Sequence, residues 1–175
     1  PYGATPGVLE YPATNILNPN TGTISMLVKK KVIGANDTEF YHLKDGTNRL
    51  YIRVLPDRFK FSVMNSDIEY PMVPELDTWY RLTLVWDNGT FYGYVNDVQV
   101  GSGTYDGVLD IGPTFKLMHN FSSSDWGSII DELLILKYAA TDKQVIAWHT
   151  VDKPLVDPDK VVKVPMVSQV LLEVV

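Results

Sequence analysis

The clearest alternation of apolar and polar residues lies between residues 79 and 100, on both sides of the tripeptide Asp87-Asn88-Gly89. The apolar positions of each arm share one face, as the two-residue period of a half-buried strand requires: Leu82, Leu84 and Trp86 in the first arm, and Phe91, Gly93 and Val95 in the second. Asn-Gly between two such arms is a common β-hairpin turn. The segment therefore predicts an antiparallel hairpin.

Similar short alternations recur along the chain, separated by clusters of Gly, Pro, Asn and Asp. They predict strands at residues 23–30, 39–43, 49–55, 58–64, 79–86, 91–95, 98–101, 115–118 and 129–138. Residues 1–22 are rich in Pro, Gly, Asn and Thr, and we expect a lead-in that crosses a sheet edge before the first strand. Many short strands with such turns predict an all-β fold, an antiparallel two-sheet β-sandwich.

One short helix is predicted near the end of the sandwich. It begins at Thr141, where Thr-Asp-Lys-Gln forms a capping box, and Val145, Ile146 and Trp148 are expected to face the sheets. After residue 150 the prolines at 154, 158 and 165 interrupt regular structure. We therefore expect residues 1–150 to form the sandwich, and residues 151–175 to form a linker and a strand that belongs to a following domain or subunit contact.

Composition narrows the possible functions. The 175 residues suffice for one domain, and the absence of cysteine excludes thiolate catalysis and disulfides. A net charge of -6 argues against nucleic acid, which requires clustered Lys and Arg. No apolar run approaches the roughly 20 residues of a membrane helix, so no membrane partner is expected. The chain begins at Pro1 rather than Met, which indicates a piece of a longer protein.

Three segments carry a family resemblance when they are taken in order. They are residues 15–30, the hairpin region 79–100, and residues 126–146 with their Trp-Gly-Ser-Ile-Ile-Asp-Glu start. Together they resemble the laminin-G-like and concanavalin A-like lectin jelly rolls over roughly residues 14–150. That resemblance implies a jelly roll, a fold whose members bind sugars, proteins or no known ligand. The exit Trp-His-Thr-Val-Asp-Lys-Pro-Leu-Val-Asp-Pro at residues 148–158 is similar to the segment that follows such domains in tail and receptor-binding proteins of bacteriophages of Gram-positive bacteria.

Catalysis is not expected from the acidic residues. A glycosidase needs two carboxyl groups across one bond, and the hydrolases of this superfamily carry theirs at alternate positions along a strand. Asp131 and Glu132 are adjacent and are predicted to point to opposite faces, and no predicted strand carries acids two residues apart. We interpret Asp131 instead as a buried acceptor of backbone N–H groups. The chain is therefore predicted not to be an enzyme.

Metal and cofactor sites are weakly indicated. His42, His119 and His149 are too scattered for a zinc site, and each is interpreted as a surface imidazole. No cofactor is expected, although calcium remains possible because laminin-G-like relatives place it in acidic loops. The candidate ligands are also ordinary turn residues: Asp87, Asp97, Asp106, Asp110 and Asp125.

Two surfaces are candidate ligand sites. The outward strand positions, expected to be exposed, are Tyr51 and Arg53, Arg81 and Thr83, and Tyr92 and Tyr94. Tyrosine and arginine on an open sheet suit sugars, whose rings stack on aromatics and whose hydroxyls take hydrogen bonds. The same residues also form strands well on a solvated face. The second surface is a Ser-rich loop containing His119, Asn120, Asp125 and Trp126, in which the Trp either packs under the loop or contacts a partner.

These observations favour a non-catalytic recognition module that binds carbohydrate, a cell-surface or cell-wall glycan. The module is expected to be part of a larger extracellular, cell-surface or virion protein. The alternative is a structural or assembly domain, a spacer or oligomerisation unit, whose C-terminal segment contacts other domains or subunits.

Overall fold

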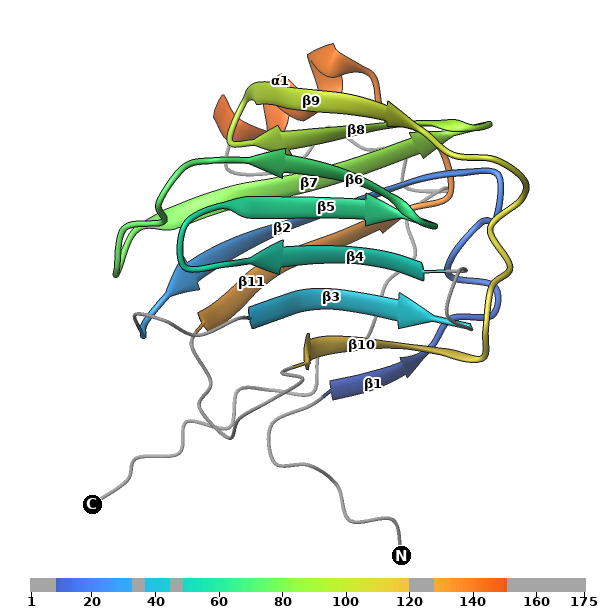
Figure 1. The fold of residues 1–175 in the computed structure, drawn as a ribbon, viewed down its shortest axis with the longest axis horizontal. Helices are drawn as coiled ribbons and strands as arrows, with labels where there is room; N and C mark the ends of the chain where they lie inside the picture. Colours follow the sequence, from blue (N-terminus) through green and yellow to red (C-terminus); the bar gives the residue numbers. More distant parts are fainter. Residues whose placement is uncertain (1–8, 33–36, 45–48, 120–127, 151–175) are drawn as a thin grey trace, which may run out of the picture.

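The computed structural model of the chain describes residues 9–32, 37–44, 49–119 and 128–150. In that part of the chain two antiparallel sheets lie face to face, and a helix packs on the outer side of one of them (Figure 1). The predicted two-sheet β-sandwich with a short helix is confirmed. Within the described residues no helix has the length and apolar character needed to span a membrane.

The first sheet, sheet A, contains six strands in the spatial order β1-β10-β3-β4-β5-β6. Their bounds are β1 (Leu9–Pro12), β10 (Thr114–His119), β3 (Asp37–Leu43), β4 (Arg49–Val54), β5 (Phe59–Val63) and β6 (Ser66–Tyr70). Two of these strands were not predicted. Strand β1 lies in the expected lead-in and pairs with β10 at the sheet edge, while β6 has only one fully buried apolar residue, Ile68.

The second sheet, sheet B, contains five strands in the order β11-β2-β7-β8-β9. Their bounds are β11 (Ser128–Leu136), β2 (Thr21–Lys30), β7 (Trp79–Asp87), β8 (Thr90–Val95) and β9 (Val98–Thr104). The hairpin predicted around Asn88-Gly89 is β7–β8, with Asp87 paired to Thr90 next to the turn. Its apolar face, including Leu82, Leu84 and Trp86, is buried in the core as expected.

The core between the sheets consists of aliphatic and aromatic side chains from alternate positions of both inner faces. The sheets approach most closely where sheet B carries glycine. A Cβ atom built on Gly93 would lie 2.7 Å from the Phe61 ring of sheet A, and one on Gly101 would lie 2.6 Å from Ile68. Bulky residues of β5 and β6 therefore occupy the space that side chains on β8 and β9 would need.

We predict that Gly93→Ala lowers the free energy of unfolding by about 1–3 kcal/mol, because the added methyl group overpacks the Phe61 contact. Ser102→Ala, at an exposed position of neighbouring β9, serves as the control and should change stability by less than about 0.5 kcal/mol. Urea unfolding of both variants measures the difference. If Gly93→Ala were as stable as the Ser102→Ala control, the sheets would be able to move apart at this point at no cost in free energy.

The helix α1 (Asp142–Thr150) begins with the predicted capping box. The Gln144 backbone N–H donates to the Thr141 hydroxyl, and the Thr141 N–H donates to the Gln144 side-chain oxygen at 2.9 Å. Val145 and Trp148 pack against sheet B as expected. The same expectation is wrong for Ile146, which is 43% exposed because it points away from the sheet.

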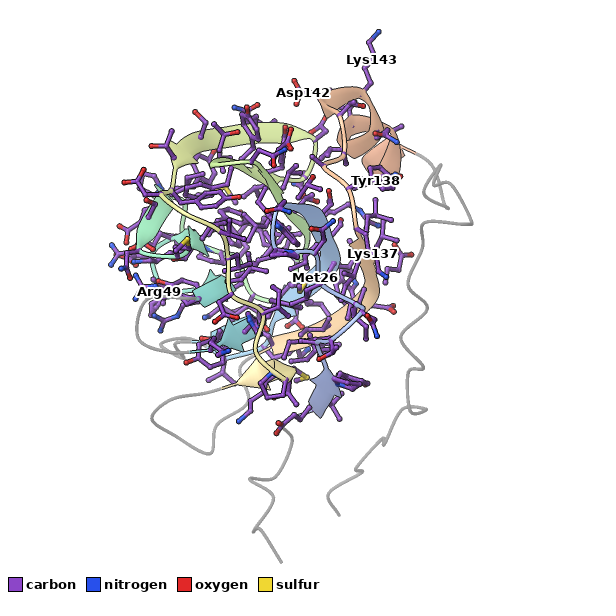
Figure 2. The ribbon with its side chains drawn as sticks, turned by 90° about the vertical axis from the view of Figure 1, so that its right-hand side faces the viewer. Met26, Arg49, Lys137, Tyr138, Asp142 and Lys143 are labelled. Carbon is purple, nitrogen blue, oxygen red and sulfur yellow. The ribbon has the colours of Figure 1, made fainter. Side chains whose placement is uncertain are left out.

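Hydrogen bonds fix α1 and the segment before it onto the outer face of sheet B. The Thr23 hydroxyl donates to the Tyr138 carbonyl and accepts from the Ala140 N–H, both at 2.9 Å. The Tyr94 hydroxyl donates to the Asp142 carboxylate, and burial together with that carboxylate raises the pKa of Tyr94. Figure 2 shows Tyr138, Asp142 and Lys143 on this side of the molecule, with Met26 between the sheets. The helix therefore covers part of one outer face.

We predict that Trp148→Ala lowers the free energy of unfolding by about 3–5 kcal/mol, since its indole is 1% exposed and fills the space between α1 and sheet B. Ile146→Ala is the matched control on the same helix, and should cost less than about 1 kcal/mol. Thermal denaturation followed by circular dichroism tests both. A small effect of Trp148→Ala would mean that α1 is not part of the cooperative unit.

Candidate functional site

The outer face of sheet A carries a row of polar and aromatic side chains that crosses all six strands. Cross-strand pairing aligns them in the order Glu10, Lys116, Tyr41, Tyr51, Ser62 and Asp67. They share this face because strand alternation directs their apolar neighbours, such as Phe40 and Ile52, into the core. In the described part of the chain no element packs over this face, and Figure 2 shows Arg49 at its surface.

We call the central part of this face the outer-face band. It consists of Tyr41, Arg49, Tyr51, Arg53, Lys60, Ser62, Asp67 and Glu69. Most of these residues belong to β4, β5 and β6, whose registers place Arg53, Lys60 and Glu69 in a second row beside the first. The band therefore spans four of the six strands of sheet A and combines aromatic, cationic and anionic groups.

Tyr51 lies at the centre of the band. The Arg49 and Arg53 guanidinium carbons are 5.4 and 5.9 Å from the centre of its ring. The two arginines sit two residues before and after Tyr51 on the same strand face, so their side chains cover the ring. The expectation that Tyr51 is exposed is therefore wrong, as only 6% of it is accessible. A ligand on this face would meet the partly exposed Arg49, Arg53 and Tyr41 side chains rather than the Tyr51 ring.

Asp67 collects hydrogen bonds from the neighbouring strands. Its carboxylate accepts from the Ser62 hydroxyl at 2.6 Å and from the Tyr51 hydroxyl at 3.2 Å. The Lys60 ammonium lies 2.8 Å from the same carboxylate and 3.0 Å from that of Glu69. These contacts hold five side chains of three strands in fixed positions before any ligand arrives.

The charges of the band stabilise one another. Burial raises the pKa of the Asp67 carboxyl, but hydrogen bonds from Lys60 and Ser62 outweigh it and the net shift is downward. Burial likewise works against the charge of Lys60, yet its bonds to Asp67 and Glu69 leave its pKa raised. The Asp67 carboxylate therefore stabilises the fold at pH values above 3.8, the ordinary pKa of an Asp side chain. This contribution is lost as pH falls through the lowered pKa of Asp67 in the folded protein.

We predict that Asp67→Asn lowers the free energy of unfolding by about 1 kcal/mol near pH 7, because Lys60 and Ser62 lose a charged acceptor. The difference from the wild-type protein should begin to shrink as pH falls below 3.8, where the unfolded chain binds the proton, and should be lost as pH falls through the lowered pKa of the folded protein. Chemical denaturation between pH 2 and pH 7 tests this. A pH-independent difference would show that the carboxylate charge contributes nothing.

Strand β6 places two acids at alternate positions, which contradicts the expectation that no strand does so. Asp67 and Glu69 share the outer face, but Lys60 lies between them and pairs with both. A glycosidase requires one carboxyl group with a raised pKa to act as the acid. The pKa of Asp67 is shifted in the other direction. This pair is therefore arranged to accept hydrogen bonds rather than to transfer protons.

The outward positions of sheet B differ from their predicted exposure. Tyr94 is 2% exposed and Thr83 is fully buried, since α1 and its flanking residues cover this end of the sheet. Tyr92 is partly buried at the edge of the same cluster. Arg81 is also buried, and its guanidinium pairs with Glu132. The expectation of an exposed Tyr92–Tyr94 surface is wrong because the helix packs there.

A β-bulge alters the geometry of the acidic pair Asp131 and Glu132. The register with β2 shifts between Asp131 and Leu134, and Glu132 has a left-handed backbone with φ of 49°. Because strict alternation is broken, both acids lie on the outer side of sheet B and Glu132 reaches Arg81. Asp131 is exposed and accepts one bond, from the Glu132 N–H at 2.8 Å, so its prediction as a buried acceptor is wrong.

His42 is not a surface imidazole. It is buried in sheet A, where its Nδ1 lies 2.9 Å from the Thr114 carbonyl oxygen and its Nε2 accepts from the Gly112 N–H at 3.3 Å. Both ring nitrogens therefore form hydrogen bonds to the backbone where the chain enters β10. Among the described residues no group of three or more His, Asp or Glu side chains is placed to hold a metal ion.

The predicted loop site lies outside the described residues. This holds for Asn120, Asp125 and Trp126, and for the side chain of His119, whose backbone ends β10. The C-terminal segment 151–175, predicted to be a linker and strand, also lies outside them. These expectations stay predictions.

Sequence reasoning found Tyr51 and Arg53 in the band but missed Lys60, Asp67 and Glu69. A usable signal was present in Ser66-Asp67-Ile68-Glu69-Tyr70, which alternates around an apolar Ile. Its low apolar content hid an edge strand, although polar residues are normal on the exposed side of such a strand.

Solved structures share this fold. Botulinum neurotoxin type C, described as entering cells through two ganglioside molecules, aligns with a TM-score of 0.63 at 12% identity over 82% of this chain and 39% of that one. Domain 4 of AbnA, an extracellular arabinanase from Geobacillus stearothermophilus in complex with arabinotriose, aligns with a TM-score of 0.59 at 25% identity. The alignment covers 74% of this chain and 66% of the AbnA chain. A pentraxin from Limulus polyphemus aligns with a TM-score of 0.58 at 19% identity, over 74% of this chain and 70% of the pentraxin chain.

The chain thus spans about two fifths of the neurotoxin chain, and the likeness there is one of fold. A search of curated protein sequences gives no significant match. A family model for the concanavalin A-like lectin and glucanase superfamily matches residues 4–146, which includes both sheets and the start of α1. The order of the strands, the two facing sheets and this match agree, and the chain belongs to the concanavalin A-like lectin/glucanases superfamily.

Proposed function

We propose that this domain is a non-catalytic recognition module that binds carbohydrate through the outer-face band of sheet A, within a larger extracellular or virion protein. The observation that carries the proposal is the band itself: an open sheet face on which hydrogen bonds hold charged and phenolic groups in place. A preorganised polar surface loses little conformational entropy when it binds a ligand.

The chemistry of the band suits sugar hydroxyls. The guanidinium groups of Arg49 and Arg53 can donate hydrogen bonds to sugar hydroxyls. The carboxylates of Asp67 and Glu69 can accept hydrogen bonds from them, and the Tyr41 hydroxyl can do both. These groups lie along neighbouring strands about 4.8 Å apart, a spacing that lets an extended saccharide contact several of them. Such a surface favours weak binding to a repeating glycan over tight binding to a single small molecule.

The solved relatives support the same function. The AbnA domain was crystallised with arabinotriose, and other aligned structures are described with gangliosides or a sialylated ligand. Fold alone does not determine function, so the proposal for this chain rests on the outer-face band and not on the likeness. The pairing of Asp67 and Glu69 with Lys60 supports binding over hydrolysis.

The test is a glycan array followed by titration of the best ligand into wild-type protein and an Arg53→Gln variant. We expect the variant to bind at least about fivefold more weakly, the effect of losing a hydrogen bond from a charged donor. Lys143→Gln is the matched control. It removes an exposed cation on α1, on the opposite side of the molecule (Figure 2), and should leave affinity unchanged.

Three outcomes would contradict this proposal. A blank array, backed by a blank pull-down on cell-wall polysaccharide, would favour the structural or assembly role. Equal binding by wild-type protein and Arg53→Gln would place any glycan site away from the outer-face band. Release of reducing sugar ends from a bound glycan would show that the domain is catalytic.

A further inference from the structure

A pocket separate from the outer-face band lies at one rim of the sandwich. Its volume is about 550 Å³, within the range of small-molecule sites. Two connections form it: the β1–β2 segment, and the β9–β10 segment that runs along the same rim in Figure 1. The residues that line this rim pocket are Thr14, Asn15, Leu17, Pro19, Val108, Leu109, Asp110 and Ile111. None of them belongs to the outer-face band.

Hydrogen bonds to the sheets hold the first connection in place. The Ala13 N–H donates to the Pro113 carbonyl at 2.8 Å, which ties the two connections together. The Leu17 N–H closes a turn onto the Ala13 carbonyl at 3.0 Å, and the buried Trp86 indole donates to the Asn18 carbonyl at 3.0 Å. The pocket wall is therefore held by bonds within and between the two connections and by one bond from the core, donated by the Trp86 indole.

The second connection is held in the same way at both of its ends. The Tyr105 N–H donates to the Gly89 carbonyl at 2.9 Å, at the turn of the β7–β8 hairpin. The Gly112 N–H donates to the buried His42 ring at 3.3 Å. Between these points Leu109 is completely buried, so it anchors the segment in the core. A pocket fixed in this way is preformed, which favours ligand binding.

The lining combines an apolar base with polar groups. Leu17 and Leu109 are buried, whereas Val108 is 62% exposed and presents an aliphatic surface beside Pro19. Thr14 and Asn15 are exposed, and neither side chain makes a hydrogen bond to the described residues. Asp110 contributes a carboxylate that pairs with Lys44 at 3.0 Å. The pocket thus offers a hydroxyl, an amide and a carboxylate around an aliphatic patch.

This combination excludes several ligand classes. The Asp110 carboxylate disfavours an anion, and a metal ion would need more acidic ligands than this pocket supplies. No aromatic side chain is among the lining residues, so a flat heteroaromatic ring would find no stacking surface. A purely apolar ligand would remove the three polar groups from water without replacing their hydrogen bonds.

We propose that the rim pocket is a second binding site that takes one neutral sugar ring. The aliphatic C–H side of the ring would lie against Val108 and Pro19, while its hydroxyls bond to Thr14, Asn15 and Asp110. The site is independent of the outer-face band, so a glycan chain and a single terminal residue can be recognised at different places on the same domain.

The test uses the full chain labelled with ¹⁵N and a panel of methyl glycosides of glucose, galactose, mannose and N-acetylglucosamine, titrated to tens of millimolar. At least one glycoside should shift the backbone amide signals of Asn15, Leu109 and Asp110 in a saturable manner. Asn15 has φ of 66°, so Asn15→Gly keeps its backbone conformation at little cost while removing the side-chain amide. This variant should bind about five- to tenfold more weakly.

Asp110→Asn should weaken binding by a similar factor, while Lys143→Gln at an exposed position of α1 should leave it unchanged. Thermal denaturation confirms that each variant is folded. Shifts confined to the outer-face band, no saturable shift with any glycoside, or unchanged affinity in both rim variants would each overturn the proposal. Failure of the rim-pocket proposal leaves glycan binding by the outer-face band open, because the Arg53→Gln array experiment tests that separately.

Discussion

The close approach of the two sheets is the constraint on which the rest of the structure depends. Phe61 and Ile68 of sheet A fill the space above Gly93 and Gly101 of sheet B, and the apolar core is closed without disulfides. Burial of so many aliphatic and aromatic side chains is the main favourable term in folding. Because the core is complete between the sheets, the outer faces are left free for other roles.

The two outer faces are used differently. Sheet B is covered at one end by α1, whose Trp148 and Val145 extend the apolar interior to a second cluster. Sheet A has no such cover in the described part of the chain, and its outer positions carry polar groups that bond to one another across strands. Tyrosine and arginine at equivalent outward positions therefore end in different environments: Tyr94 becomes part of a helix contact, and Arg53 stays partly exposed on an open face.

The rim is a third environment, formed by connections rather than strands. Its backbone is fixed by bonds to the buried Trp86 indole N–H and to Nε2 of the buried His42 ring, two polar atoms that need a partner inside the protein. The same bonds that satisfy the core therefore shape the rim pocket. This coupling explains how exposed residues such as Thr14 and Asn15 come to stand in defined positions near Asp110.

The sequence by itself determined the fold class, the β7–β8 hairpin and the start of α1, because alternation, the Asn-Gly turn and the capping box are local signals. It could not determine exposure on the outer faces. Tyr51 and Tyr94 both occupy outward strand positions, yet arginines of the same strand cover one and a helix about fifty residues later covers the other. The bulge at Glu132 and the rim pocket were likewise decided by tertiary structure. Each depends on contacts between residues far apart in the chain, which a pattern of neighbouring residues does not contain.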